Sequence, residues 1–217
     1  MEQITTSKKA ELVQSAKLPF TEKLALTDAG RIVGHLVLSE SFDHPVLEVL
    51  RLFNQALKES VFERYALAGG LAVEYYGAPI NTVDADFLVV FPLTINGLLD
   101  PSAFYEFFEG KGAGLAGEYL VFRGLKFQMI PANSELDAEA LQMAVSVSEK
   151  GIRFFVVTLE HLVALKLKAW RYKDRLHINH LLDSGVPLDQ ANLSSILERH
   201  QLEQRWKQLL AERKPSS

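Results

Sequence analysis

Cysteine is absent from all 217 residues of the chain, which excludes disulfide bonds and thiolate metal sites. Six histidines are present, but none of them forms the HxxxH or HExxH spacing of a helical zinc site. Residues 1–20 lack the apolar core of a signal peptide, and no uncharged run approaches the length of a membrane span. We therefore expect a soluble, cytoplasmic protein with no membrane partner.

Neither sign of charge dominates the sequence. The 23 lysines and arginines stand against 27 aspartates and glutamates, which gives a formal net charge of -4. A general electrostatic attraction to nucleic acid is therefore not indicated, although a local basic patch is compatible with this balance. Hydrophobic residues make up 48% of the chain, enough for one compact domain with an appendage or for two small domains.

The expected elements run from mixed strands and helices to helices alone, which predicts an α+β fold. Apolar spacing and turn residues indicate helices at 45–60, 71–77, 101–108 and 135–145. Strands are expected at 65–70, 82–91 and 152–158, and 118–131 reads as two strands joined tightly at Arg123-Gly124. Two helices follow, at 158–185 and 192–214.

These patterns divide the chain into three parts: an N-terminal extension at 1–41, a core at 42–157 and a C-terminal helical subdomain at 158–217. At the end of the extension, 22–42 suits a hairpin around Asp28-Ala29-Gly30. The hairpin faintly resembles the wing of a DNA-binding winged helix, but too little chain surrounds it for that domain.

Asp84 and Asp86 stand in the otherwise apolar run TVDADFLVVF. On a strand, residues i and i+2 share a face, so both carboxylates project together with Thr82 beside them. The alternate residues point the other way, into the core: Val83, Ala85, Phe87 and Val89. Adjacent carboxylates repel unless a cation lies between them, and Mg²⁺ prefers carboxylate and phosphate oxygens. We therefore expect Asp84 and Asp86 to bind Mg²⁺, or Mn²⁺ in its place; the alternative is a solvent-facing pair at a sheet edge.

Gly69 and Gly70 fall between a predicted strand and a predicted helix. A Gly-Gly turn at this point lets backbone N–H groups approach a phosphate at the positive end of the helix. We expect these two glycines to contact the phosphates of a nucleotide. The alternative is a tight left-handed turn without a ligand.

The run from Thr158, a plausible N-cap, to Gly185 reads as one long amphipathic helix. At about 100° per residue, one sector of a continuous helix holds five chemically notable side chains. They are Lys166, Trp170, Lys173, Asp174 and His177. Lys166 and Lys173 suit triphosphate oxygens, and Asp174 suits a role in orienting a lysine or as a base. The alternative is a solvated helix face with i,i+4 ion pairs.

The ordered combination of strand, Gly-Gly, helix and DxD strand resembles the nucleotidyltransferase superfamily of the DNA polymerase β type. It is most similar to the bacterial AbiEii-like group, which includes toxins of toxin–antitoxin pairs. That family has hG[GS] at a helix start and then a DxD, often preceded by Arg-x-Thr-x. Here the positions read Gly69-Gly70 and then INTVDAD, from Ile80 to Asp86.

The resemblance continues into the helical region and covers roughly residues 45–185. The family pattern ehLhalKLxAxRxKDxxD is similar to EHLVALKLKAWRYKDRLH, at 160–177. Lys166 falls on the lysine of the pattern, and Arg171, Lys173 and Asp174 fall on its later cluster. The resemblance implies a small mixed sheet flanked by helices, with the C-terminal helical subdomain closing a cleft.

Three positions depart from the family pattern. The third carboxylate that catalytic members carry on a later strand is Gln128, which has no charge and cannot act as a base. The arginine before the DxD is Ile80, and the terminal aspartate of the later cluster is His177. With Gln128 at the position of the third carboxylate, the family pattern supplies no general base on this strand.

The resemblance implies transfer of a nucleoside monophosphate from an NTP to a hydroxyl acceptor, either an RNA 3′ end or a protein. It also implies a toxin role with an antitoxin protein as partner. The alternative is a catalytically inactive member of the same fold that binds a nucleotide or a partner, and a purely structural role is a third reading. Metal-dependent label transfer that is lost on Asp84→Asn distinguishes the first reading from the other two.

Overall fold

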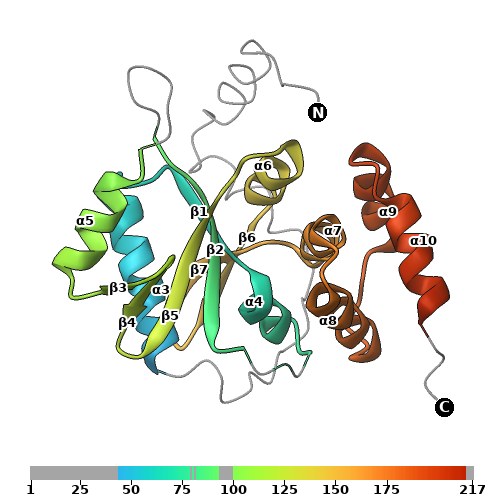
Figure 1. The fold of residues 1–217 in the computed structure, drawn as a ribbon, viewed down its shortest axis with the longest axis horizontal. Helices are drawn as coiled ribbons and strands as arrows, with labels where there is room; N and C mark the ends of the chain where they lie inside the picture. The colour runs from blue at the N-terminus through green and yellow to red at the C-terminus, as the bar shows by residue number, and fades with distance from the viewer. Residues whose placement is uncertain (1–43, 79, 81, 93–99, 214–217) are drawn as a thin grey trace, which may run out of the picture. The chain divides into compact units, whose positions relative to one another are not determined.

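The computed structural model describes residues 44–78, 80, 82–92 and 100–213. In this part of the chain, seven strands form one mixed sheet in the order β3-β4-β5-β2-β1-β7-β6 (Figure 1). The strands are β1 (Arg64–Ala68), β2 (Asp84–Val90), β3 (Gly114–Ala116), β4 (Tyr119–Phe122), β5 (Leu125–Pro131), β6 (Val145–Glu149) and β7 (Ile152–Val156). The pairs β2–β5 and β1–β7 are parallel and the other pairs are antiparallel. The α+β prediction is confirmed.

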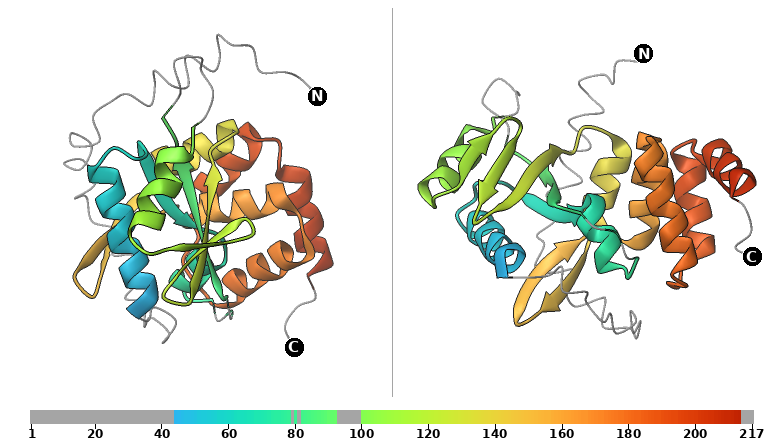
Figure 2. Two further views of the ribbon diagram at one scale, coloured as in Figure 1. Left: turned by 60° about the vertical axis from the view of Figure 1, so that its left-hand side comes forward. Right: turned by 60° about the horizontal axis from the view of Figure 1, so that its bottom comes forward.

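Helices cover both faces of the sheet. They are α3 (His44–Lys58), α4 (Gly69–Tyr75), α5 (Ser102–Gly110), α6 (Glu135–Gln142), α7 (Leu159–Ala169), α8 (Tyr172–Asp183), α9 (Gln190–Arg199) and α10 (Glu203–Glu212). Figure 1 shows α3 and α5 on one face, and α4 and α6 on the other, with α7 to α10 beyond them. The β6–β7 hairpin extends beyond the rest of the sheet (Figure 2).

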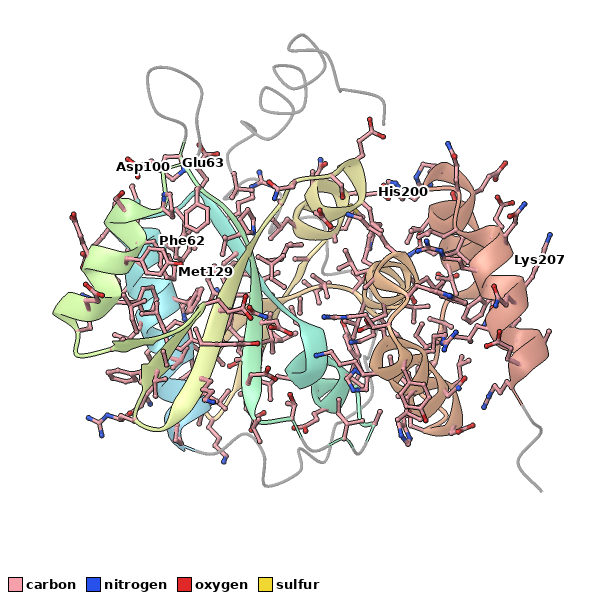
Figure 3. All side chains as sticks on the ribbon, in the orientation of Figure 1. Phe62, Glu63, Asp100, Met129, His200 and Lys207 are labelled. Carbon is pink, nitrogen blue, oxygen red and sulfur yellow. The ribbon has the colours of Figure 1, made fainter. Side chains whose placement is uncertain are left out.

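The core between the sheet and the α3–α5 layer is built on phenylalanine. Phe53 of α3 is fully buried and stacks on Phe87 of β2, with ring centroids 3.8 Å apart. Phe62, which Figure 3 shows on this side of the sheet, lies 5.6 Å from Phe53 between centroids. Because side chains alternate along a strand, the fully buried Ala85, Phe87 and Val89 face this core. Asp84 and Asp86 therefore face the opposite layer, which contains α4.

The C-terminal helices are tied to the sheet layer through Glu139 of α6. Its carboxylate accepts hydrogen bonds from Arg199 Nη2 at 2.5 Å and His200 Nε2 at 2.7 Å, and lies 3.3 Å from His161 Nε2. Figure 3 shows His200 in the space between α6 and α9. Burial alone would raise the pKa of Glu139, but the hydrogen bonds from Arg199, His200 and His161 outweigh it and lower this pKa to about 2.

The structure corrects the two long helices expected after Thr158. The first one breaks at Trp170, whose backbone is left-handed with φ 55°, and continues as α8 from Tyr172. The second breaks at Gln201, with φ 56°, between α9 and α10. Neither position is glycine or proline, so local propensity gave no sign of the breaks.

Smaller differences concern the strands. β2 begins at Asp84, two residues after the expected start, and Val83 just before it is 78% exposed instead of pointing into the core. The short strands β3 and β6 were not expected. The turn at Arg123-Gly124 is confirmed, with φ 48° and 86° at its two residues. No helix in the described ranges is long and apolar enough to cross a membrane. The hairpin expected at 22–42 lies outside the described residues.

Candidate active site

The two aspartates lie together on β2, and each carboxylate is fixed by a neighbouring polar side chain. Thr82 Oγ1 donates to Asp84 Oδ1 at 2.8 Å. Gln128 Nε2, on the adjacent parallel strand β5, donates to Asp86 Oδ1 at 2.6 Å. Oδ2 of each aspartate takes no part in these two bonds. Two carboxylates on one face supply the hard oxygen donors and the charge that one Mg²⁺ or Mn²⁺ prefers.

Asp84 and Asp86 are both half-buried, and the surroundings of Asp86 shift its pKa. Burial raises the pKa of Asp86, and the charge of Asp84 raises it further. The hydrogen bond from Gln128 and the positive charges of Lys166 and Lys173 act in the opposite direction. Both lysines that the sequence suggested therefore exert their charge on this carboxylate, although they come from other elements.

The two glycines leave room for the site residues. Gly69 has φ +62°, and a Cβ placed on it would lie 1.9 Å from Asp86 Oδ2. A Cβ on Gly70 would lie 2.7 Å from Thr82 Oγ1. Glycine at both positions thus lets the start of α4 approach β2 so closely that Asp86 and Thr82 fill the space. Contact between these glycines and a phosphate stays a prediction.

The break at Trp170 assembles a cluster that a continuous helix could not form. Along an unbroken helix, Lys166 and Asp174 would be about 12 Å apart. Because α8 turns back along α7, Lys166 Nζ lies 3.7 Å from Asp174 Oδ1 and 3.0 Å from His177 Nδ1. Arg171 Nε donates to Asp174 Oδ2 at 2.6 Å. Trp170, which the sequence placed in the same sector, instead contacts two arginines. The guanidinium groups of Arg175 and Arg205 lie 5.2 and 5.7 Å from its ring centroid.

Burial sets the protonation of this cluster. Lys166 is 5% exposed and Asp174 is 2% exposed. Burial lowers the pKa of Lys166 to about 8, although Asp174 and Asp86 partly oppose it. Burial and the charge of Lys166 lower the pKa of His177 to about 4, so this imidazole is neutral at pH 7 and its Nδ1 accepts from the lysine ammonium. Burial would raise the pKa of Asp174, but the hydrogen bond from Arg171 and the charge of Lys166 lower it.

Two neighbours of the aspartates, Lys126 and Tyr119, were not predicted from the sequence. Lys126 of β5 is the register partner of Asp84, and its side chain is exposed. Burial and the charges of Asp84, Glu118 and Asp86 raise the pKa of Tyr119 of β4, which places this phenol within electrostatic reach of both aspartates. The alternation of LKFQMIP could have suggested Lys126, whereas Tyr119 depends on how β4 pairs with β5.

Glu74 of α4 fixes the segment that precedes β2. It is 5% exposed, and its Oε1 accepts from the backbone N–H of Thr82 at 2.9 Å. Thr82 in turn donates to Asp84. Glu74 thus holds Thr82, whose hydroxyl in turn holds Asp84.

Comparison with solved structures identifies the fold. The chain is similar to ANT(2″)-Ia in complex with adenylyl-2″-tobramycin, with a TM-score of 0.50, 13% sequence identity, and coverage of 75% of this chain and 99% of that one. The chain has a nucleotidyltransferase-like fold. It is also similar to an antigenic nucleotidyltransferase-like protein from Paracoccidioides brasiliensis, with a TM-score of 0.47, 14% identity, and coverage of 75% and 92%. No protein-family model matches the sequence, and neither does any curated protein.

Proposed function

We propose that this protein is a metal-dependent nucleotidyltransferase that moves a nucleoside monophosphate from an NTP to a hydroxyl acceptor. The acceptor oxygen bonds to the α-phosphorus, the bond from that phosphorus to the bridging oxygen breaks, pyrophosphate leaves, and the hydroxyl proton passes to water. The observation that supports the proposal is that three basic side chains of the α7–α8 region act on the aspartate pair of β2. Lys166, Lys173 and Arg171 all interact electrostatically with Asp86.

In this proposal the residues have distinct roles. Asp84 and Asp86 hold Mg²⁺ or Mn²⁺, which when bound acts as a Lewis acid toward phosphate oxygens. Lys166 and Lys173 bind phosphate oxygens, and Gly69, Gly70 and Thr82 shape the nucleotide side of the site. Asp174 is buried and paired with Arg171 and Lys166, so it orients Lys166 rather than accepting the proton of the acceptor.

For the acceptor we propose an RNA 3′ end or a protein, in keeping with the AbiEii-like resemblance and a toxin that pairs with an antitoxin. ANT(2″)-Ia was solved with an adenylylated small molecule, so tobramycin belongs in any acceptor panel. The second candidate is a nucleotide-binding or partner-binding protein without turnover. Gln128 favours it, because a neutral amide stands where catalytic members have a carboxylate.

The test is a transfer assay with each of four α-labelled NTPs in Mg²⁺ or Mn²⁺. Total RNA, lysate protein and tobramycin serve as acceptors. The variant is Asp84→Asn/Asp86→Asn, and Asp100→Asn, which changes an exposed aspartate outside the site, is the matched control. Label transferred by the wild type and by Asp100→Asn, but not by the double variant, supports the proposal. Nucleotide binding that depends on the aspartates but is not followed by transfer supports the second candidate. If the protein neither binds nor transfers a nucleotide, both candidates are wrong.

A further inference from the structure

Gln128 changes the donor set of the site in a specific way. It is the register partner of Asp86 on the neighbouring parallel strand, and its amide nitrogen lies 2.6 Å from Asp86 Oδ1. A carboxylate at this position would repel Asp86 unless both were bound to a cation. The amide instead donates a hydrogen bond to Asp86 Oδ1, so its partial positive charge, and not a second carboxylate, lies against this oxygen.

Charged side chains of both signs surround Asp86. Asp84, Asp86 and Asp174 supply the negative charges of the cluster. Lys166, Lys173 and Arg171 supply as many positive charges, and each of the three acts on Asp86. A triphosphate with one divalent cation remains anionic and suits such surroundings. A second divalent cation would add positive charge next to three basic side chains, with an amide in place of the balancing carboxylate.

We propose that this site binds a single divalent cation with its nucleotide, and that basic side chains of the protein take the place of a second cation. The proposal rests on the proposed function and specifies how that site binds metal. Lys166 is the central basic residue, because Asp174 and His177 hold its ammonium in place. Gln128 is a positioning residue that acts through Asp86.

The decisive substitution is Gln128→Glu, which keeps the side-chain size and adds one negative charge. Gln142→Glu makes the same change at an exposed position of α6 and is the matched control. Each protein is titrated with Mn²⁺ at saturating concentration of a non-hydrolysable NTP analogue. Equilibrium dialysis counts the bound ions per chain. Electron paramagnetic resonance separates isolated ions from spin-coupled pairs, which arise when two ions share a site at about 3.5–4 Å.

We expect one uncoupled Mn²⁺ per chain for the wild type and for Gln142→Glu, and two coupled ions for Gln128→Glu. Two coupled ions in the wild type would overturn the inference and leave the proposed function standing. The same holds if folded Gln128→Glu, checked by circular dichroism, still binds one ion. If Asp84→Asn/Asp86→Asn binds as much Mn²⁺ as the wild type, the proposed metal site itself is wrong. The wild-type count tests the inference even if Gln128→Glu does not fold.

Discussion

Substituting Gly69 by alanine tests how closely the start of α4 approaches the aspartates. The new Cβ would lie 1.9 Å from Asp86 Oδ2, whereas ordinary contact begins at 3.4 Å. Asp86 must therefore move by about 1.5 Å in the packed interior. Its hydrogen bond from Gln128, now 2.6 Å long, would then exceed the bonding range.

Two costs add in Gly69→Ala. The left-handed backbone costs about 1–2 kcal/mol with alanine, and the lost hydrogen bond to a charged carboxylate costs about 1.5–3 kcal/mol. Gly151 of the β6–β7 turn has φ +79° with nothing within 4 Å of an added Cβ. Gly151→Ala therefore carries the backbone cost alone and is the matched control.

Urea denaturation and the binding of a fluorescent NTP analogue measure the two consequences. We expect the free energy of unfolding to fall by roughly 2.5–5 kcal/mol in Gly69→Ala and by roughly 1–2 kcal/mol in Gly151→Ala. Nucleotide binding should be lost only in Gly69→Ala. Equal destabilisation of both variants, with nucleotide binding retained in Gly69→Ala, would refute the packing described for Gly69 and Asp86.

Three further predictions concern the polar contacts. The pKa of Lys166 is about 8 in the folded protein, against an ordinary 10.5. Between about pH 8 and pH 10.5 the unfolded chain therefore binds one more proton at this residue than the folded protein does. The stability of the wild type should rise with pH over this range, relative to Lys166→Met, by up to about 3 kcal/mol. Chemical denaturation at several pH values checks this prediction, and Lys207→Met, on the outer side of α10 (Figure 3), is the control. If the free energy of unfolding changes with pH in the same way for wild type and Lys166→Met, the prediction is wrong. The Glu139 carboxylate, with its pKa near 2 instead of 4.5, stabilises the fold fully above pH 4.5 and loses this effect as the pH falls toward 2. The destabilisation by Glu139→Gln should therefore be largest at about pH 7, smaller at about pH 3 and small only near about pH 2. Thr82→Val removes the hydroxyl that donates to Asp84 at 2.8 Å, so it should weaken Mn²⁺ binding in a calorimetric titration and cost about 1 kcal/mol of stability, whereas Thr82→Ser should not.

The central strands and the first helix were predictable because their patterns are strong. The alternation of β2 decided which face carries Asp84 and Asp86, and the burial of Ala85 and Phe87 agrees with it. The apolar spacing of 45–60 likewise gave α3, whose Phe53 is buried as expected. In these segments, local pattern and tertiary packing favour the same structure.

The break at Trp170 was not predictable, because its cause is tertiary. A left-handed tryptophan costs about 1–2 kcal/mol. The cost is offset by Arg205 of α10, whose Nη1 donates to the carbonyls of Leu167 and Lys168 at 2.9 and 2.7 Å. Those partners lie more than 30 residues away in the sequence, so no local signal marks the break.

The candidate site likewise contains residues that local patterns predict and contacts that only the tertiary structure creates. Both aspartates and both lysines follow from spacing and from the family resemblance, whereas the contact between Lys166 and Asp174 follows only from the unexpected turn between α7 and α8. Lys126 and Tyr119 require the pairing of three strands before they can be assigned to the site.

The central claim is that Asp84 and Asp86 support nucleotidyl transfer. The most direct measurement is the Mg²⁺-dependent rate of pyrophosphate release, with the NTP and acceptor that the transfer assay selects, for wild type and for Asp84→Asn/Asp86→Asn. We predict release by the wild type and a rate lower by roughly two orders of magnitude or more in the double variant. Equal rates in the two proteins, or no release by the wild type with any NTP, would contradict the account.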